Sequence, residues 1–306
     1  MPMPTVRDVH IDTALSNISI AYTNAAFIAD QVFPVVGVNK KTDYYWVFPK
    51  AAWQRDEVAI RAPGTRAARA DYDITTASYV AINYAIAKVV PDEVRDNADN
   101  PLRPDVEATE FVTSALLRAL ERRVANLTTG GSGLWAYSTT PTTQWSVDTS
   151  DPWGDIDAAM NGVISVTGAQ PNVAVMSWDV WRHLRQHPDF LDRVKYTRPS
   201  GRVEVGDLRS WFGFDKVLIG NSLWDKAQEG VTASPLYIWG DQFWCGYVPA
   251  TPSLMTPAAG YVLEWGNRTV RRYREDQEHQ DVVEAMHYTD EVITASDSGA
   301  VLYNVV

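Results

Sequence analysis

The chain lacks the features that mark several classes of protein. It has a single cysteine, Cys245, which excludes an intrachain disulfide and favours an intracellular or redox-indifferent setting. Residues 1–5 show no basic segment leading into an apolar one, so we expect no signal peptide. The longest uncharged run of interest, 242–263, carries three prolines and two glycines. Those residues predict loops and short strands there, and no membrane helix.

Positive charge is also scarce. The formal net charge of −11 argues against a general nucleic-acid binder, whose affinity would depend on Lys and Arg against phosphate. The charge is uneven, because residues 275–306 contain eight acidic residues and no Lys or Arg. This segment fits either a solvated strand face or a functional acidic surface, and the sequence leaves both open.

Motifs for catalysis are missing as well. The chain has no Gly-x-Ser-x-Gly turn, no phosphate-binding loop, no dinucleotide fingerprint and no zinc signature. His183 and His187 lie four apart and would share a helix face, where they could hold a metal. Pro188 breaks that turn and no third ligand has an obvious place, so we interpret both as surface histidines at a helix end. We therefore expect no catalytic residue, no cofactor and no metal.

What the chain does have is a long alternating segment, residues 36–90. The first limb, 36–53, is centred on the apolar run 44–48, and the return limb, 72–90, places apolar side chains on one face: Tyr72, Ile74, Val80, Ile82, Tyr84 and Ile86. A period of two predicts half-buried strands, so the segment is expected to form a two-stranded arm. Pro63 and Gly64 interrupt its tip, which is studded with four arginines: Arg55, Arg61, Arg66 and Arg69.

An arm of this kind needs support. An isolated hairpin is only marginally stable in water, and a long exposed edge invites pairing with another chain. The sequence shows nothing in its own chain for the arm to lean on, so we expect it to rest on another subunit. This pattern indicates assembly instead of catalysis.

A long helix follows the arm. Prolines near residue 101 and early carboxylates mark its start, and apolar residues recur at the helical period from Val112 to Leu127. We predict a helix over 105–127, which would be roughly 35 Å long. The glycine-rich run 130–133 is expected to cap its C-terminal end.

The rest of the chain divides in two. From Asp151 to about residue 250, helices (152–167, 178–186) and a segment that begins a turn or a helix (205–212) alternate with strands (172–176, 214–219, 236–247), which predicts a compact α/β lobe. From residue 258 the pattern returns to strands at 261–265, 269–273, 282–288, 291–295 and 300–306.

This order of parts resembles a major capsid protein of a tailed phage with the HK-ninety-seven-type fold. The resemblance covers nearly the whole chain and is carried best by residues 172–196, 208–224 and 281–306. It implies an α+β fold in four parts. These are an N-terminal arm (1–35), an extended β-hairpin loop (36–90), a peripheral domain around the spine helix 105–127 (91–150 with 251–306), and an α/β axial domain (151–250).

The resemblance also implies a function. The chain would be a non-enzymatic structural protein of the virion, assembled in the host cytoplasm into hexamers and pentamers of an icosahedral head. The head would enclose double-stranded DNA without sequence-specific binding and without a membrane. A separate scaffolding protein, a decoration or cement protein, and a portal at one vertex are the implied partners. Covalent crosslinking is not indicated, since Lys40, Lys41 and Lys50 fit solvated side chains on an edge strand.

The candidate intersubunit contacts all lie on the arm: Arg55, Arg61, Arg66, Arg69, Tyr44, Trp46 and Trp53. We expect the arginines to meet acidic surface on a neighbouring subunit. If the acidic stretch 275–306 faces inward, it would repel packed DNA and let the genome slide. Two alternatives remain. One is an encapsulin-like nanocompartment shell, disfavoured by the long N-terminal arm. The other is a carbohydrate-active enzyme, suggested only by the twelve tryptophans and the many acids.

Overall fold

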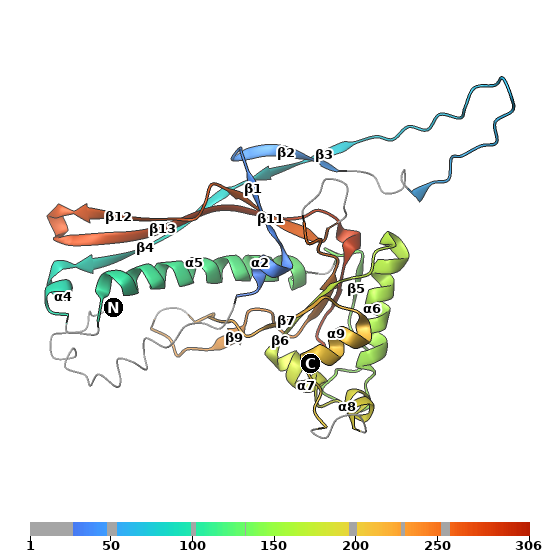
Figure 1. Cartoon of the computed structure of the whole chain (residues 1–306). Coiled ribbons are helices and arrows are strands. Elements are labelled where there is room, and N and C mark those ends of the chain that lie inside the picture. The colour runs from blue at the N-terminus through green and yellow to red at the C-terminus, as the bar shows by residue number, and fades with distance from the viewer. Residues whose placement is uncertain are drawn as a thin grey trace.

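The computed structural model describes residues 27–47, 54–98, 102–131, 133–195, 201–227, 230–251 and 258–306. Its body is elongated, with a thin arm projecting beyond one end, as Figure 1 shows. Two five-stranded sheets build the body, and two further pairs of strands lie outside them.

The first sheet is organised around one long strand, β13 (Gln280–Ile293). On one side β13 pairs with β4 (Ile82–Pro91), and on the other it pairs first with β12 (Thr269–Glu275) and then with β11 (Gly260–Trp265), all antiparallel. β1 (Val35–Val38) extends the sheet as a parallel neighbour of β11. Two of the predicted strands, 282–288 and 291–295, are therefore parts of one strand. A 3₁₀ turn, Asp276–Glu278, connects β12 to β13.

The helix α5 (Pro104–Thr129) lies along this sheet (Figure 1). It begins one residue before and ends two residues after the predicted 105–127. Asp105 and Glu107 sit in its first turn, where carboxylates suit the helix dipole, and Gly130 caps its end. Its apolar stripe packs against the sheet in a small core: Val90, Ala108, Val112, Leu116, Val283 and Ala285.

The second sheet forms the α/β lobe. Its strand order is β5 (Tyr137–Thr139), β14 (Gly299–Leu302), β10 (Phe243–Gly246), β6 (Val173–Ser177) and β7 (Lys216–Gly220). The helices of the lobe are α6 (Pro152–Thr167), α7 (Trp178–Leu184), α8 (Pro188–Val194) and α9 (Val205–Phe212). The carboxylate of Asp151 caps α6 and the hydroxyl of Ser177 caps α7, as their positions in the sequence indicate.

Two strands of the lobe differ from the sequence prediction. The predicted strand 236–247 is two short ones, β9 (Pro235–Tyr237) and β10, separated by a turn in which Gly240 has a φ of +54°. The chain end was grouped with the strands after residue 251, yet β14 lies in the second sheet between β5 and β10. All four β14 residues are buried, because the strand is central and covered on both faces.

The arm is shorter as a hairpin than its alternating pattern predicts. Within the described residues, which leave out 48–53, the two limbs pair with each other along β2 (Thr42–Val47) and β3 (Thr75–Val80), against predicted limbs of 36–53 and 72–90. The outer parts of both limbs, β1 and β4, pair within the first sheet. Tyr84 and Ile86 of β4 pack toward the core under α5, which gives them more contact than a free hairpin could. The root of the arm therefore packs against its own chain, and the expectation that the arm finds no support there is wrong for this part.

A buried carboxylate ties the chain start to the body. Glu121 of α5 is fully buried and accepts hydrogen bonds from the backbone N–H groups of Ile28 and Ala29 and from the indole of Trp239. The Glu121 carboxylate thus accepts hydrogen bonds from N–H groups at the start of the short helix α2 (Ala29–Val32), which have no partner within the helix. Burial raises the pKa of Glu121, and the hydrogen bonds oppose that shift. The strand pair β8 (Leu223–Asp225) and β9 packs nearby, with Arg122 over the Trp224 ring.

An ion-pair cluster lies at the end of the body opposite the arm, and we call it the corner cluster: Asp92, Arg95, Asp105, Arg272, Arg274 and Asp281. Asp281 is its centre, 2.6 Å from Arg95 and 2.5 Å from Arg272. The cluster joins the short helix α4 (Asp92–Asp96), the start of α5 and the β12–β13 hairpin. The hydrogen bond from Arg272 holds the pKa of Asp281 below its ordinary value.

The Glu121 contacts predict a large loss of stability on truncation. Glu121→Ala leaves three buried donors without an acceptor, each worth about 1–3 kcal/mol, so we expect a total loss of at least about 2 kcal/mol. Urea unfolding of the soluble subunit, followed by tryptophan fluorescence, measures this. Glu110→Ala, an exposed change on the same helix, should stay within about 0.5 kcal/mol of the parent. Equal midpoints for the two variants would show that Glu121 is not a structural anchor.

The corner cluster predicts a pH-dependent contribution. A carboxylate whose pKa is lower in the folded than in the unfolded state stabilises the fold at pH values above the unfolded-state pKa, about 3.9 for Asp. That stabilisation is lost as the pH falls through the pKa of the folded state. The melting-temperature difference between the parent and Asp281→Asn should be constant above about pH 5 and should shrink below about pH 4. Asp96→Asn, an exposed carboxylate in α4, is the control and should show no such trend. A difference that stays the same from about pH 3 to pH 6 would contradict the assignment.

Candidate intersubunit surface

The described part of the arm beyond β2 and β3 exposes its apolar side chains. Over residues 54–74 nearly every position is exposed. Val58 is 93% exposed and Ile60 is 104% exposed, as much as in an extended peptide. Fully burying such a side chain is worth about 1.5–3 kcal/mol, so this surface gains markedly from any partner that covers it.

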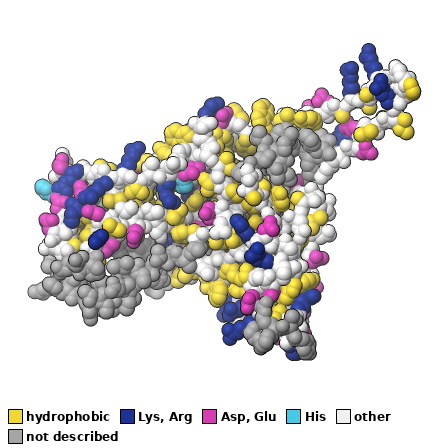
Figure 2. Space-filling view, viewed as in Figure 1, with side chains coloured by type: hydrophobic (Ala, Val, Ile, Leu, Met, Phe, Trp, Pro, Cys, Tyr) yellow, Lys and Arg dark blue, Asp and Glu magenta, His cyan; other side chains and the backbone are white. Residues whose placement is uncertain are grey.

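The arginines predicted at the tip are where the sequence pattern suggests. Arg55 pairs with Glu57 at 3.0 Å, and Arg61 donates to the backbone carbonyl of Thr65. Within the described residues, Arg66 and Arg69 have no ion-pair partner. From Val58 to Ala70 the chain carries three arginines and no acidic residue. Figure 2 shows these basic side chains gathered at the far end of the arm beside exposed apolar ones.

Tyr44 and Trp46 give the hairpin an aromatic face. Both lie on β2, two residues apart, so their side chains point to the same side of the hairpin. They are 71% and 59% exposed, and their cross-strand partners are the small residues Ser78 and Thr76. Of the seven predicted contact residues, Trp53 lies outside the described residues. The other six are exposed side chains of the arm.

The arm is not wholly separate from the lobe. The side-chain amide of Gln54 donates to the carbonyl of Val166 near the end of α6, at 3.0 Å. At the arm's root, Lys40 pairs with Asp43 at 2.9 Å and Lys41 lies over the Tyr288 ring. These contacts are those of surface lysines, in keeping with the interpretation given to Lys40 and Lys41. Lys50 lies outside the described residues.

The acidic stretch 275–306 is not uncompensated. Asp281 is paired within the corner cluster, and Glu291 accepts two hydrogen bonds of 3.0 Å from Arg123. Asp276 lies 3.4 Å from Arg274. The fold brings arginines from α4, α5 and β12 against these acids, which the linear sequence cannot show. Three of the eight acids, Asp276, Asp281 and Glu291, therefore have an arginine partner. That the stretch repels packed DNA stays a prediction.

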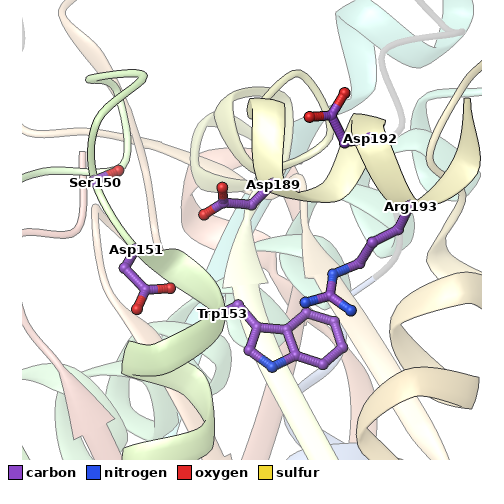
Figure 3. Close-up of a pocket in the computed structure, with 6 residues that line it drawn as sticks. All are labelled: Ser150, Asp151, Trp153, Asp189, Asp192 and Arg193. Carbon is purple, nitrogen blue, oxygen red and sulfur yellow. The ribbon is translucent and has the colours of Figure 1, made fainter.

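One shallow hollow lies on the α/β lobe, away from the arm. Figure 3 shows its lining residues, which come from the start of α6 and from α8: Ser150, Asp151, Trp153, Asp189, Asp192 and Arg193. Arg193 stacks over the Trp153 ring at 3.7 Å, and Asp151 is occupied as the α6 cap. Asp192 lies 3.9 Å from the ammonium group of Lys195.

His187 lies behind this hollow and corrects the sequence prediction. It is 2% exposed, so it is a core residue and no surface histidine. Its Nδ1 accepts the N–H of Asp189 at the start of α8, and its Nε2 lies 3.1 Å from the Ser150 hydroxyl. An Nδ1 acceptor places the ring proton on Nε2, an assignment inferred from the hydrogen bonds.

That tautomer decides what the Ser150–His187–Asp189 group can do. A serine nucleophile needs a ring nitrogen with a free lone pair facing its hydroxyl. Here Nε2 carries the proton, and the Ser150 hydroxyl donates instead to the carbonyl of Val147 at 2.8 Å. The group therefore joins the loop before α6 to the start of α8 and does not form a catalytic triad.

The described residues contain neither a metal-binding group nor a membrane helix. No set of three His, Cys, Asp or Glu side chains within them could hold a metal ion. In the same part of the chain, no helix combines the length and apolar character needed to cross a bilayer. Cys245 is fully buried, and burial raises the pKa of its thiol to about 12, which makes it unreactive.

Three candidate residues of the arm and its root, Val58, Ile60 and Asp290, are not among those predicted from the sequence. Val58 and Ile60 drew no notice because isolated apolar residues in a polar segment are common. The sequence feature that could have indicated them is that both lie between Arg55 and Arg61, at the start of a stretch without acidic residues. Asp290, whose side chain accepts the backbone N–H of Val80 at the arm's root, had no local signal at all.

Comparisons with known proteins agree on one family. No family model matches the chain. The major capsid protein of Burkholderia phage BcepMu is 26% identical over 282 residues, covering 87% of this chain and 87% of that protein. The major capsid protein of Pseudomonas phage JBD67 is also 26% identical, over 234 residues, covering 75% of this chain and 74% of that protein.

Solved structures share the architecture. A phage-related protein from Bordetella bronchiseptica matches with a TM-score of 0.71 at 20% identity, covering 96% of this chain and 97% of that one. A virus-like particle from Pyrococcus furiosus matches with a TM-score of 0.55 at 10% identity, covering 97% of each chain. At these identities the likeness shows the fold alone. The α+β fold is therefore the HK-ninety-seven type, and over most of its length the chain is similar to two phage major capsid proteins, which are structural components of the virion.

Proposed function

We propose that the chain builds an icosahedral phage head from hexamers and pentamers, and that its arm is a principal contact between neighbouring subunits. The observation that carries this is the arm's exposed apolar surface at Val58 and Ile60, which the subunit itself does not cover. The head would enclose double-stranded DNA as a container, without reading its sequence.

The geometry of the arm suits a head-to-tail contact. The arm projects from one end of an elongated body, so the surface it reaches on a neighbour differs from the surface that offers it (Figure 1). Contacts of this heterologous kind close into rings when the rotation between subunits allows it. Six-fold and five-fold rings of one subunit are the expected products.

Charge would set the register of the contact. The segment from Val58 to Ala70 carries three arginines and no acid, while the whole chain has a net charge of −11. Each exposed ion pair contributes only about 0–1 kcal/mol, so the arginines act through their number and the apolar side chains supply most of the energy. Many copies of a weak contact still give a stable shell.

The two sheets support a division of labour. We propose that the first sheet with α5 is the peripheral domain, and that the second sheet with its helices is the axial domain at the centre of each capsomer. β14 returns to the axial sheet, so the boundary within 251–306 would lie before residue 299. A non-enzymatic role, a separate scaffolding protein, a decoration or cement protein and a portal follow from the family resemblance. Assembly in the host cytoplasm follows from it too.

A nanocompartment shell is the second candidate, because a virus-like particle shares the fold. The phage reading is favoured by the two phage major capsid proteins, each of which resembles this chain over about three quarters of its length or more. The contents of particles purified from the native source separate the two functions. Packaged DNA supports the phage head, and a protein cargo supports the nanocompartment.

The arm predicts a clean separation of folding from assembly. Deleting residues 54–70 should leave a soluble subunit with unchanged circular dichroism and abolish shells in negative-stain electron microscopy, because nearly all of the removed residues are exposed and the hydrogen bond from Gln54 to Val166 that is lost lies at the surface. A less drastic variant, Val58→Ser with Ile60→Ser, should raise the concentration needed for assembly several-fold. Loss of folding, or shells in normal yield without the loop, would contradict the proposal.

Charge reversal tests the arginines separately. Replacing Arg61, Arg66 and Arg69 together by Glu should prevent assembly near physiological salt, since the tip would then match the sign of the acidic chain. The same three positions changed to Lys keep the charge and serve as the matched control, which should assemble. Normal shells from the Glu variant would show that the tip does not meet acidic surface.

A further inference from the structure

The return limb of the arm meets the body at a single residue. The continuous stretch from Thr75 to Pro91 pairs with β2 up to Val80 and with β13 from Ile82 onward. Ala81 belongs to neither ladder and is fully buried. The strand therefore changes partners at Ala81, and the direction of the arm is set by whatever holds the residues on either side.

Two hydrogen bonds at this point stay within the arm. The N–H of Ala81 donates to the carbonyl of Lys41 at 2.8 Å, and the Tyr79 hydroxyl donates to the carbonyl of Lys40 at 3.1 Å. Both join the two limbs of the arm to each other. They fix the hairpin internally and leave its angle to the first sheet undetermined.

A third hydrogen bond joins the arm to the body. The N–H of Val80 donates to the carboxylate of Asp290 at 2.9 Å, and Asp290 belongs to β13. The β4–β13 ladder ends at Thr289, while the backbone of Asp290 is already in register with Leu263 of β11. The side chain of Asp290 thus continues the contact where the backbone ladder has stopped. A carboxylate is a strong acceptor for this task.

We propose that Asp290 is a positioning residue for assembly, which fixes the angle between the arm and the first sheet and so selects the surface of a second copy that the arm reaches. This rests on the proposed function. The lever is long, because up to 16 extended residues separate Val80 from Gly64 and span roughly 50 Å. A swing of about 10° at the root would move the tip by about 9 Å, more than the reach of a side-chain contact.

The angle can be measured without assembly. Spin labels placed by Ala59→Cys on the arm and Asn126→Cys on α5 report the arm-to-body distance in the soluble full-length subunit. The native Cys245 is buried and stays unlabelled. Asp290→Ala should broaden the distance distribution at least two-fold, and Asp290→Asn, which keeps a carbonyl oxygen, should stay near the parent. Glu284→Ala, on the same strand, is the control.

Electron microscopy then links the angle to assembly. Asp290→Ala should give few shells, or shells of mixed diameter, while Asp290→Asn and Glu284→Ala give uniform ones. An unchanged distance distribution in Asp290→Ala overturns the proposal, and so does a broadened distribution with normal shells. Should Asp290→Ala fail to fold, a near-parent distribution and uniform shells for Asp290→Asn support the proposal, and a broadened one overturns it. The loop deletion tests the function separately, because it removes the contact itself.

Discussion

The structure depends on one long strand, β13, whose backbone pairs with three different strands. Its 14 residues are shared between β4 on one side and β12 and β11 on the other. The same strand carries Asp281, Asp290 and Glu291, each of which binds a donor from a different part of the chain. The sheet, the long helix, the corner cluster and the arm's root are therefore held in one frame. Relative movement of any of them requires a change at β13.

Rigidity in the body and exposure in the arm are connected. A subunit that covered Val58, Ile60, Tyr44 and Trp46 with its own chain would be more stable alone and would have less to gain from a neighbour. Leaving that surface open costs stability in the free subunit. The body offsets this with a well-packed core under α5 and with buried polar contacts such as those of Glu121. On the proposed function, the energy of assembly would come from an element whose side chains are largely exposed in the free subunit.

The order of elements was predictable because each has a local signal. The long helix, the caps at Asp151 and Ser177 and most strands could be placed within a few residues from periodicity and capping chemistry. The arm's basic and aromatic residues could be singled out for the same reason. Pairing partners could not be. The limbs 36–53 and 72–90 alternate throughout, yet in the described residues β2 pairs with β3 while β4 pairs with β13. Alternation predicts a half-buried strand but does not predict which strand lies beside it.

The sequence by itself determined the composition-level facts: no disulfide, no recognisable catalytic motif, a basic arm tip on an acidic chain, and an α+β order of elements that resembles a capsid subunit. Tertiary structure alone decided three things. It paired Asp281 and Glu291 with arginines of other elements, it buried His187 in a tautomer that cannot activate Ser150, and it placed Asp290 at the root of the arm. The contacts of Arg123 with Glu291, of Ser150 with His187 and of Val80 with Asp290 join residues far apart in the chain, and no local pattern encodes such contacts.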